Sequence, residues 1–333
     1  MYVPSLDRRL AELVDWLNND LALDVQQISP ASSDASFRRY FRVEHRHGCH
    51  IAMDAPPDKE NTEPFVRVAE LLKPTDIHVP NIFSQNRRQG FLLLEDLGST
   101  SYLDRLQIDN AAELYRQALD SLLKLQLGVN PADCGLPAYD SNLLLKELGI
   151  FYEWFLEKLL GIAAPDALTT TLNSILIDSA LEQPQVFVHR DFHSRNLMVL
   201  AHDSPGVIDF QDAVIGPISY DLVSLLRDCY IAWPEPQVDR WAQQYHQRLL
   251  AAGMLEADFN QFKRWFDLMG MQRHLKAVGI FARLHLRDGK SNYLADIPRT
   301  LAYIARVCED YPELAEMRQF LQEEVLPAYR APA

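Results

Sequence analysis

The chain has 333 residues, of which 48% are hydrophobic and 23% charged, an ordinary balance for a globular protein. A chain of this length is too long for one ordinary hydrophobic core, which favours two lobes or domains. The net charge of −14 argues against DNA or RNA as a partner, because binding a phosphate backbone requires a basic face. Nucleotide binding stays open, since a local patch and a metal ion suffice for it. No run of about 18 apolar residues is present, so we expect no membrane span.

The first residues and the cysteines predict a cytoplasmic protein. MYVPSLDRRLAELVDWL lacks the basic-then-apolar order of a signal peptide and predicts instead an amphipathic helix capped by Ser5. The four cysteines are scattered without a C-x-x-C pair. This argues against a zinc site or a disulfide framework and favours reduced thiols.

Residues 1–98 predict a small lobe built mainly from β structure. ISPASSDASFRRYFRVEHRHGCHIAMDAP (28–56) predicts a polar turn, a strand, a turn at His47 and Gly48, and a second strand. EPFVRVAELLK (63–73) predicts a short helix, and VPNIF (79–83) and GFLLLEDLGS (90–99) predict two further strands.

Residues 99–333 predict a larger lobe that is mainly helical. AAELYRQALDSLLKLQL (111–127) and SNLLLKELGIFYEWFLEKLLG (141–161) have helical patterns, and more helices follow residue 238. The only β signals in this lobe are VFVHRDF (186–192), NLMVL (196–200) and GVIDF (206–210). The chain shows no internal repeat and no low-complexity segment.

The polar residues between these short strands form the most informative motif. In HRDFHSRN (189–196), Asp191 and Asn196 keep the H-R-D-x-x-x-x-N spacing of protein kinase catalytic loops, and Asp209 follows in D-F-Q where kinases have D-F-G. Mg²⁺ prefers a few hard oxygen ligands that leave room for phosphate oxygens, which Asn196 and Asp209 can supply. Asp191 then remains to accept the proton of a substrate hydroxyl. A lone Asp in a polar loop usually caps a turn, but the whole pattern between strands favours the site.

This motif resembles that of a known superfamily. His193 replaces the lysine typical of protein kinases, and HRDFHSRN resembles the H-x-D-x-H-x-x-N of the aminoglycoside phosphotransferase and choline kinase superfamily. LLLEDLG (92–98) and GPISYDLVSLL (216–226) are similar to that superfamily's hinge and G-x-x-x-x-D-L-A segments. The resemblance implies an α+β, bilobal protein-kinase-like fold: a small N-terminal nucleotide-binding lobe (1–98) with an antiparallel sheet, and a larger helical lobe (99–333) for catalysis and substrate. It also implies ATP and Mg²⁺ as cofactors.

The resemblance assigns nucleotide binding to the phosphate-loop position and the hinge. SDASFRRYF (33–41) stands in the phosphate-loop position with small residues instead of glycines. The candidates for cofactor binding are Ser33, Ser36, Phe37, Arg38, Arg39, Glu95 and Leu97.

Three further polar residues, two in the motif and one after it, are expected to brace the loop. For His189 and His193 we favour tying the loop's backbone together over chemistry, because proton transfer is already assigned. His193 is in addition a candidate for substrate binding. Asp221 is interpreted as a carboxylate that braces the loop rather than as a metal ligand.

The spacing after the motif excludes a peptide substrate. Twelve positions separate Asp209 from Asp221, and no A-P-E segment follows. No long activation segment fits there, so we expect a small-molecule acceptor.

Two residues depart from the kinase pattern. Met53 stands where kinases have a lysine, and Phe65 stands where they have its glutamate partner. Loss of both together is expected if apolar packing replaced an ion pair. Arg38 and Arg39 are then candidates to neutralise the phosphates, with solvated strand residues as the alternative.

Several segments together resemble one subgroup, the cell-wall sugar kinases that phosphorylate N-acetylmuramate and N-acetylglucosamine at the anomeric hydroxyl and recycle peptidoglycan sugars. They are FRRYFRV (37–43), MDAPPDKE (53–60), GFLLLEDLG (90–98), MQRHLKAVGIFARL (271–284) and RDGKSNYL (287–294). This resemblance implies a sugar substrate and no obligate protein partner.

The C-terminal basic residues agree with an anionic or neutral sugar rather than a polycation. Arg273, Lys276 and Arg283 can share a broad helix face and meet a lactyl carboxylate, with Arg287 and Lys290 following. The alternative is an ordinary solvated helix face. Among the aromatics, Tyr230 is the candidate to contact the sugar, whereas Trp154 and Phe155 are expected in the core.

Two other functions stay open. One is transfer to another small hydroxylated molecule, such as an amino alcohol or an aminoglycoside. The other is a nucleotide-binding pseudokinase, suggested only by the missing lysine and opposed by the intact Asp191, Asn196 and Asp209.

Overall fold

The computed structural model describes residues 7–33, 37–202 and 204–330, and the chain divides into two compact units. The first unit comprises residues 1–124 and 195–212, and the second comprises residues 125–194 and 213–333. The first unit contains the whole of the predicted N-terminal lobe, 1–98. The assignment of nucleotide and substrate functions to the predicted lobes stays a prediction.

The first unit combines a sheet with short helices. Its elements are α1 (Arg8–Asp15), η1 (Trp16–Asp20), β1 (Val25–Ser33), β2 (Arg39–His45), β3 (Gly48–Asp54), α2 (Glu63–Leu72), η2 (Lys73–Thr75), β4 (Ile82–Asn86), β5 (Phe91–Glu95), α3 (Tyr102–Arg105), most of α4 (Ala111–Gly128), β7 (Leu197–Met198) and β8 (Gly206–Val207).

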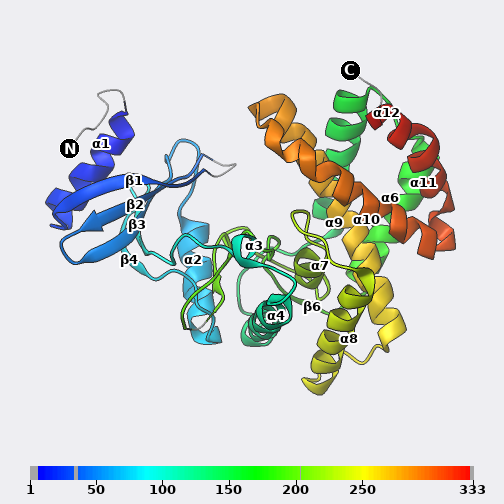
Figure 1. The fold of residues 1–333 in the computed structure, drawn as a ribbon, viewed down its shortest axis with the longest axis horizontal. Helices are drawn as coiled ribbons and strands as arrows, with labels where there is room; N and C mark the ends of the chain where they lie inside the picture. Colours follow the sequence, from blue (N-terminus) through cyan, green and yellow to red (C-terminus); the bar gives the residue numbers. More distant parts are fainter. Residues whose placement is uncertain (1–6, 34–36, 203, 331–333) are drawn as a thin grey trace. The chain divides into compact units, whose positions relative to one another are not determined.

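The five longer strands form one antiparallel sheet in the order β1-β2-β3-β5-β4. The predicted hairpin between β2 and β3 is confirmed, with His45 opposite Gly48. Figure 1 shows α1 beside this sheet. The alternate residues Phe41 and Val43 of β2 and Phe91 and Leu93 of β5 pack with the apolar side of α1 and η1. The period-2 pattern of the strands therefore gives the sheet one face covered by a helix.

The prediction of a polar turn is wrong for residues 28–33, which belong to β1. This strand is at the edge of the sheet and pairs only with β2. An edge strand tolerates polar residues, and Pro30 lies where the register shifts, the kind of place in which a sheet accepts proline.

The first helix begins later than predicted. Asp7 caps α1 by accepting a hydrogen bond from the Leu10 amide at 3.0 Å. The predicted cap, Ser5, lies outside the described residues. The apolar spacing predicted the helix, but the capping side chain of Asp7 sets where the helix starts.

The second unit is mainly helical. Its elements are the end of α4, α5 (Ser141–Ile150), η3 (Phe151–Leu160), α6 (Asp166–Leu181), β6 (Gln185–Val188), β9 (Val214–Pro217), α7 (Tyr220–Leu226), α8 (Glu235–Ala251), α9 (Phe259–Asp288), η4 (Ser291–Asp296), α10 (Ile297–Asp310), η5 (Pro312–Leu314), α11 (Ala315–Phe320), η6 (Leu321–Val325) and α12 (Leu326–Arg330).

Helix α9 is the central element of the second unit and packs against η3, α6, α7 and α10 (Figure 1). Its middle is buried on all sides, as expected of a helix inside a core. At Gly279 a Cβ atom would lie 2.6 Å from backbone atoms of Ile150 and Phe151. Glycine is therefore required where α9 meets the junction of α5 and η3.

The β structure of this unit exceeds what the sequence indicated. Strand β9 pairs antiparallel with β6, and it was not predicted. Its four residues carry glycine and proline, so neither alternation nor a β-branched run distinguishes them. Among the described helices, none is both long and apolar enough to cross a membrane.

Candidate active site

The loop that follows β6 is held by a buried carboxylate. The Asp221 side chain at the start of α7 accepts backbone hydrogen bonds from His189 at 2.6 Å and Arg190 at 3.0 Å. Burial raises the pKa of Asp221 to about 7. The predicted bracing role of Asp221 is confirmed by these two bonds. His189 braces the loop too, because its Nδ1 accepts from the Asp191 amide at 3.3 Å.

Arg190 is held in a strained conformation by side chains of the helical unit. Its φ is +76°, which is uncommon for a residue with a Cβ and tends to occur at functional sites. Its guanidinium pairs with Glu147 of α5, and Lys276 of α9 reaches the same carboxylate at 2.9 Å. Tyr139 donates to Glu147 as well. One carboxylate therefore fixes the loop to two helices.

Glu147 was missed from the sequence, although a signal for it exists. It is only 3% exposed, and it shares a helix face with the buried Leu144, Leu148 and Phe151. An acidic residue at a position that spacing assigns to the core must pair with a cation.

Asp191, the predicted proton acceptor, follows this braced segment. Its side chain is 46% exposed, so the carboxylate can meet a substrate. Burial works to raise its pKa, but the charges of Lys276, His193, Arg273 and Arg190 outweigh burial and hold that pKa below its ordinary value. The carboxylate is therefore ionised near neutral pH and able to accept a proton.

The residues just after Asp191 are anchored to a second buried carboxylate. Ser194 donates to Asp228 from its amide at 2.9 Å and from its hydroxyl at 2.5 Å, and the Tyr230 amide donates to the same side chain at 2.8 Å. The His193 ring packs edge-on against Tyr230, with centroids 5.2 Å apart, and its Nε2 lies 4.0 Å from Asp191. The two predicted substrate residues His193 and Tyr230 are thus brought together beside Asp191.

The three predicted basic residues of α9 have different surroundings. Arg273 and Lys276 are buried, whereas Arg283 is half-buried. Lys276 is committed to Glu147, and Arg273 contacts the Cys229 sulfur at 3.6 Å. Burial and the neighbouring Arg287 lower the pKa of Arg283. The charges of Arg273 and Lys276 act on Asp191, whereas Arg283 lies further along the helix.

The expected core aromatics lie as predicted. Phe155 is fully buried in the core of the second unit, and Trp154 is partly buried against that core.

The predicted metal ligands belong to the first unit. Asn196 precedes β7 and Asp209 follows β8, and the two strands pair. The Asn196 amide lies 3.4 Å from the Asp209 carboxylate, which also accepts from the Gln211 side chain at 2.8 Å. Asp209 has a φ of +66°, a second strained residue of the kind found at functional sites. Pairing of β7 with β8 therefore joins residues 13 positions apart.

These side chains fit a magnesium ion bound together with phosphate. Asn196 and Asp209 offer neutral and anionic oxygens, the donors that Mg²⁺ prefers, and few of them. Within the described part of the chain, no group of three or more His, Cys, Asp or Glu side chains could hold a metal ion by itself. A site of two protein ligands completed by phosphate oxygens and water agrees with both facts.

Arg39, a candidate for phosphate binding, is engaged within the protein. Its guanidinium donates to Asp54 at 3.0 Å and pairs with Asp7 as well. Asp54 is fully buried and also pairs with Arg9 of α1. These four residues, called the balanced cluster below, join α1 to the sheet. Arg38 is the neighbouring half-buried residue just before β2.

The other described candidates of the phosphate-loop position are Ser33, at the end of β1, and Phe37, shortly before β2. Phe37 is 59% exposed, with the Lys59 ammonium 4.6 Å from its ring centre. Its amide donates to Glu60 at 3.1 Å. Ser33 is the last residue of β1 and pairs with Arg39, and Ser36 lies outside the described residues.

The hinge residues Glu95 and Leu97 follow β5. His78 and Asn81 bond the Glu95 carboxylate at 2.9 and 2.7 Å, and burial, which acts to raise its pKa, is outweighed by these contacts, so that the pKa is lowered. Leu97 is buried against Gly206. The side chain of Glu95 is thus occupied, and nucleotide binding by Glu95 and Leu97 stays a prediction.

Met53 and Phe65 are both buried, as expected if apolar packing replaced an ion pair. Met53 is fully buried in β3, and Phe65 is 4% exposed. The ring of Phe65 packs against Phe210, with centroids 4.8 Å apart. Phe210 directly follows the predicted metal ligand Asp209, so α2 supports the metal segment through an aromatic contact.

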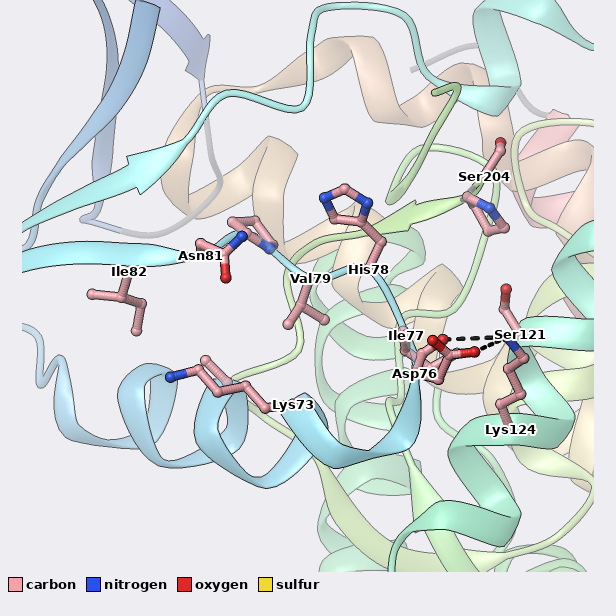
Figure 2. A pocket seen from close by; sticks show the side chains of 13 residues that line it. Lys73, Asp76, Ile77, His78, Val79, Asn81, Ile82, Ser121, Lys124 and Ser204 are labelled. Carbon is pink, nitrogen blue, oxygen red and sulfur yellow. Dashed lines mark hydrogen bonds and ion pairs between the residues drawn. The ribbon is translucent and has the colours of Figure 1, made fainter. Parts of the chain in front are cut away.

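The first unit also contains a cavity of about 330 Å³, shown in Figure 2. It is lined by the loop from Asp76 to Ile82, by Lys73, by Ser121 and Lys124 of α4, and by Ser204 and Pro205. Lys124 bonds Asp76 at 2.7 Å (Figure 2). None of the predicted site residues lines this cavity, although its His78 binds Glu95 and accepts from the Val207 amide at 2.8 Å.

Sequence comparisons agree with the geometry. The model of the phosphotransferase enzyme family matches residues 27–259. An N-acetylmuramate/N-acetylglucosamine kinase from Pseudomonas putida is 47% identical, with 96% of this chain and 98% of that protein covered. Kinases of the same name from Pseudomonas aeruginosa and Neisseria meningitidis are 45% and 41% identical, over 95% and 96% of this chain and 97% and 96% of those proteins.

Solved structures share the fold at low identity. Aminoglycoside 2′-phosphotransferase-IIIa in complex with GDP has a TM-score of 0.64 and 14% identity, over 89% of this chain and 99% of that one. A choline kinase from Streptococcus pneumoniae has a TM-score of 0.60 and 12% identity, over 89% and 99%. These likenesses confirm the predicted α+β, protein-kinase-like fold.

Proposed function

Since the chain belongs to the phosphotransferase enzyme family, we propose that it is an ATP-dependent kinase for N-acetylmuramate and N-acetylglucosamine. The transferred phosphoryl group goes to the anomeric hydroxyl, and the product enters the recycling of peptidoglycan sugars in the cytoplasm. Three curated relatives between 41% and 47% identical carry this substrate pair in their names.

The observation that carries the proposal is the state of Asp191. It is half-exposed, its pKa is held low by surrounding cations, and the segments on both sides of it are fixed by Asp221 and Asp228. A fixed, ionised carboxylate is the group that phosphoryl transfer to a hydroxyl needs, because that chemistry depends on positioning and electrostatics.

In this mechanism the anomeric oxygen forms a bond to the γ-phosphorus while the bond from that phosphorus to the bridging oxygen breaks. ADP leaves with the bonding electrons, and Asp191 takes the hydroxyl proton. When bound, a magnesium ion neutralises charge on the phosphate oxygens, and Asn196 and Asp209 are the residues that would hold it. His193 and Tyr230 contact the sugar beside Asp191.

The test is a transfer assay with ATP and Mg²⁺ over N-acetylmuramate, N-acetylglucosamine, choline and kanamycin, with the phosphate located by NMR. We expect phosphate at the anomeric carbon of both sugars and no transfer to the two cations. Phosphorylation of choline or kanamycin instead would establish the alternative acceptors. Nucleotide binding with no transfer to any acceptor would establish a pseudokinase.

A further inference from the structure

The buried cations of the second unit differ in how their charge is compensated. Among the described lysines and arginines, three residues are buried: Arg227, Arg273 and Lys276. Arg227 pairs with Glu235 and Asp267, and Lys276 pairs with Glu147. Arg273 is 5% exposed and forms no ion pair with a carboxylate of the described residues.

The contacts of Arg273 leave most of its hydrogen-bonding capacity unused. Its Nη1 points at the Cys229 sulfur at 3.6 Å, and its Nε has no hydrogen-bond partner in the described structure. Sulfur is a weak acceptor, whereas a guanidinium carries five N–H donors. A buried charged group in this state is costly unless an anion completes its surroundings.

The carboxylates around Arg273 are occupied by other donors. Asp228 takes three hydrogen bonds from Ser194 and Tyr230. Asp221 takes two from the loop backbone. Asp191 is about half-exposed, and its proposed task is to accept a proton. Among the described residues, no carboxylate therefore forms an ion pair with Arg273.

The position of Arg273 relates it to the substrate side of the loop. Cys229, which it contacts, lies between Asp228, the anchor of Ser194, and Tyr230, the partner of the His193 ring. Its charge contributes to the lowered pKa of Asp191. A group bound to the free N–H donors of Arg273 would thus lie in the neighbourhood of His193, Tyr230 and Asp191.

The other basic candidates are less suited to this task. Lys276 is already paired with Glu147. Arg283 is ten residues further along α9, roughly 15 Å at the rise of a helix, and Lys290 follows the end of that helix.

We propose that Arg273 alone of these cations binds a carboxylate of the substrate and thereby sets the preference for N-acetylmuramate over N-acetylglucosamine. This inference rests on the proposed function. The two sugars differ only in the lactyl ether, whose carboxylate can accept two parallel N–H bonds from one guanidinium. For the neutral sugar, water fills the place of the carboxylate.

The experiment compares Arg273→Gln with the wild type, using KM and kcat for both sugars and for the methyl ester of N-acetylmuramate. We expect the KM of the wild type for N-acetylmuramate to be about tenfold or more below that for its ester, the usual effect of one charge-assisted contact. In Arg273→Gln this difference should disappear, while KM for N-acetylglucosamine changes less than about twofold.

Arg264→Gln is the matched control, because it removes the same charge from the same helix at a residue that pairs with Glu313 at the surface. It should keep the wild-type discrimination between acid and ester. If Arg273→Gln does not fold, as judged by its melting curve, Arg273→Lys supplies the readout. Lysine keeps the charge but not the paired N–H geometry, so the discrimination should fall to a smaller value.

Equal KM values of the wild type for the acid and the ester would overturn the assignment. So would equal increases for both sugars in the Arg273 variants. A wild type that phosphorylates neither sugar would overturn the proposed function itself, which separates the two failures.

Discussion

Two groups of charges, each with buried and part-buried members, illustrate how differently one chain uses ionic residues. In the balanced cluster of the first unit, Arg9 and Arg39 face Asp7 and Asp54, so charges match and every guanidinium bonds a carboxylate. In the second unit, the cations Arg190, Arg273 and Lys276 surround Glu147 and Asp191, with Arg273 lacking a carboxylate partner among the described residues. The second set is called the surplus cluster below.

The difference separates stability from function. Matched pairs join α1 to the sheet, and each guanidinium is engaged by a carboxylate of the protein. The excess positive charge of the surplus cluster costs stability by itself. It is useful where an anion binds or where a carboxylate must stay ionised. The four predictions below test this contrast, from the largest expected effect to the smallest.

Asp191→Asn should remove activity and leave the fold intact. Loss of a proton acceptor costs about 10²–10⁴ in kcat, and nucleotide affinity should stay near that of the wild type because the predicted metal ligands are retained. Transfer rates and a nucleotide titration measure both. Since the pKa of Asp191 is held below its ordinary value of 3.8, the wild-type rate should show no acid limb from this group between pH 5 and 8. A variant with near-wild-type turnover would remove Asp191 from the chemistry.

Asp54→Asn should reduce stability and leave catalysis nearly unchanged. Two arginines lose the buried carboxylate between them, which should cost about 2–3 kcal/mol, less than for a fully buried pair because both guanidiniums still contact water. Urea unfolding measures the free energy, and kcat and KM at low temperature should match the wild type. Asp76→Asn, which breaks an exposed pair with Lys124, is the control and should change neither quantity. A large loss of kcat in Asp54→Asn would show that the balanced cluster has a catalytic role.

Asp221→Asn should alter the pH dependence of stability. A carboxyl whose folded pKa is raised to about 7 favours the folded state below pH 3.8, and that contribution is lost as the pH rises through 7. From pH 5 to pH 7 the wild type should therefore lose about 2 kcal/mol that the variant does not lose. Denaturant titrations at both pH values give the difference. Equal losses in the two proteins would show that Asp221 is ionised throughout.

Met53→Lys should give no gain in kcat. The substitution restores the residue type that kinases carry at this position, but here Phe65 offers no carboxylate and the site is apolar. An unpaired cation in the first unit should lower the melting temperature instead. An increase in kcat would show that the phosphates lack a cation that lysine can supply.

The sequence was most informative where chemistry depends on spacing within one segment. The motif predicted that Asp191 lies in a loop and that Asn196 and Asp209 lie beside two short strands, as the structure has them. The β2–β3 hairpin follows from its alternating pattern. Strand β1 escaped prediction because an edge strand tolerates polar residues and proline. Strand β9 escaped because pairing with β6, rather than its own composition, defines it.

Partners of charged residues were the least predictable feature of the site. Arg39 meets Asp7 and Asp54, which are 32 and 15 positions away, and Lys276 meets Glu147 across two helices. Basic residues at helical spacing look alike in a sequence. Only tertiary packing decides which one finds a carboxylate and which one is left for a ligand.

The contact between Phe65 and Phe210 has a consequence for the conditions under which the enzyme can work. Salt screens the lysine–glutamate pair of a typical kinase, because that attraction is electrostatic. An aromatic contact draws on buried apolar surface, which ionic strength up to physiological levels leaves unchanged and cooling weakens. Support from α2 for the segment of Asp209 and Phe210 is therefore tied to temperature rather than to salt. The contact presents no charge that a phosphorylation event or a regulatory partner could compete for.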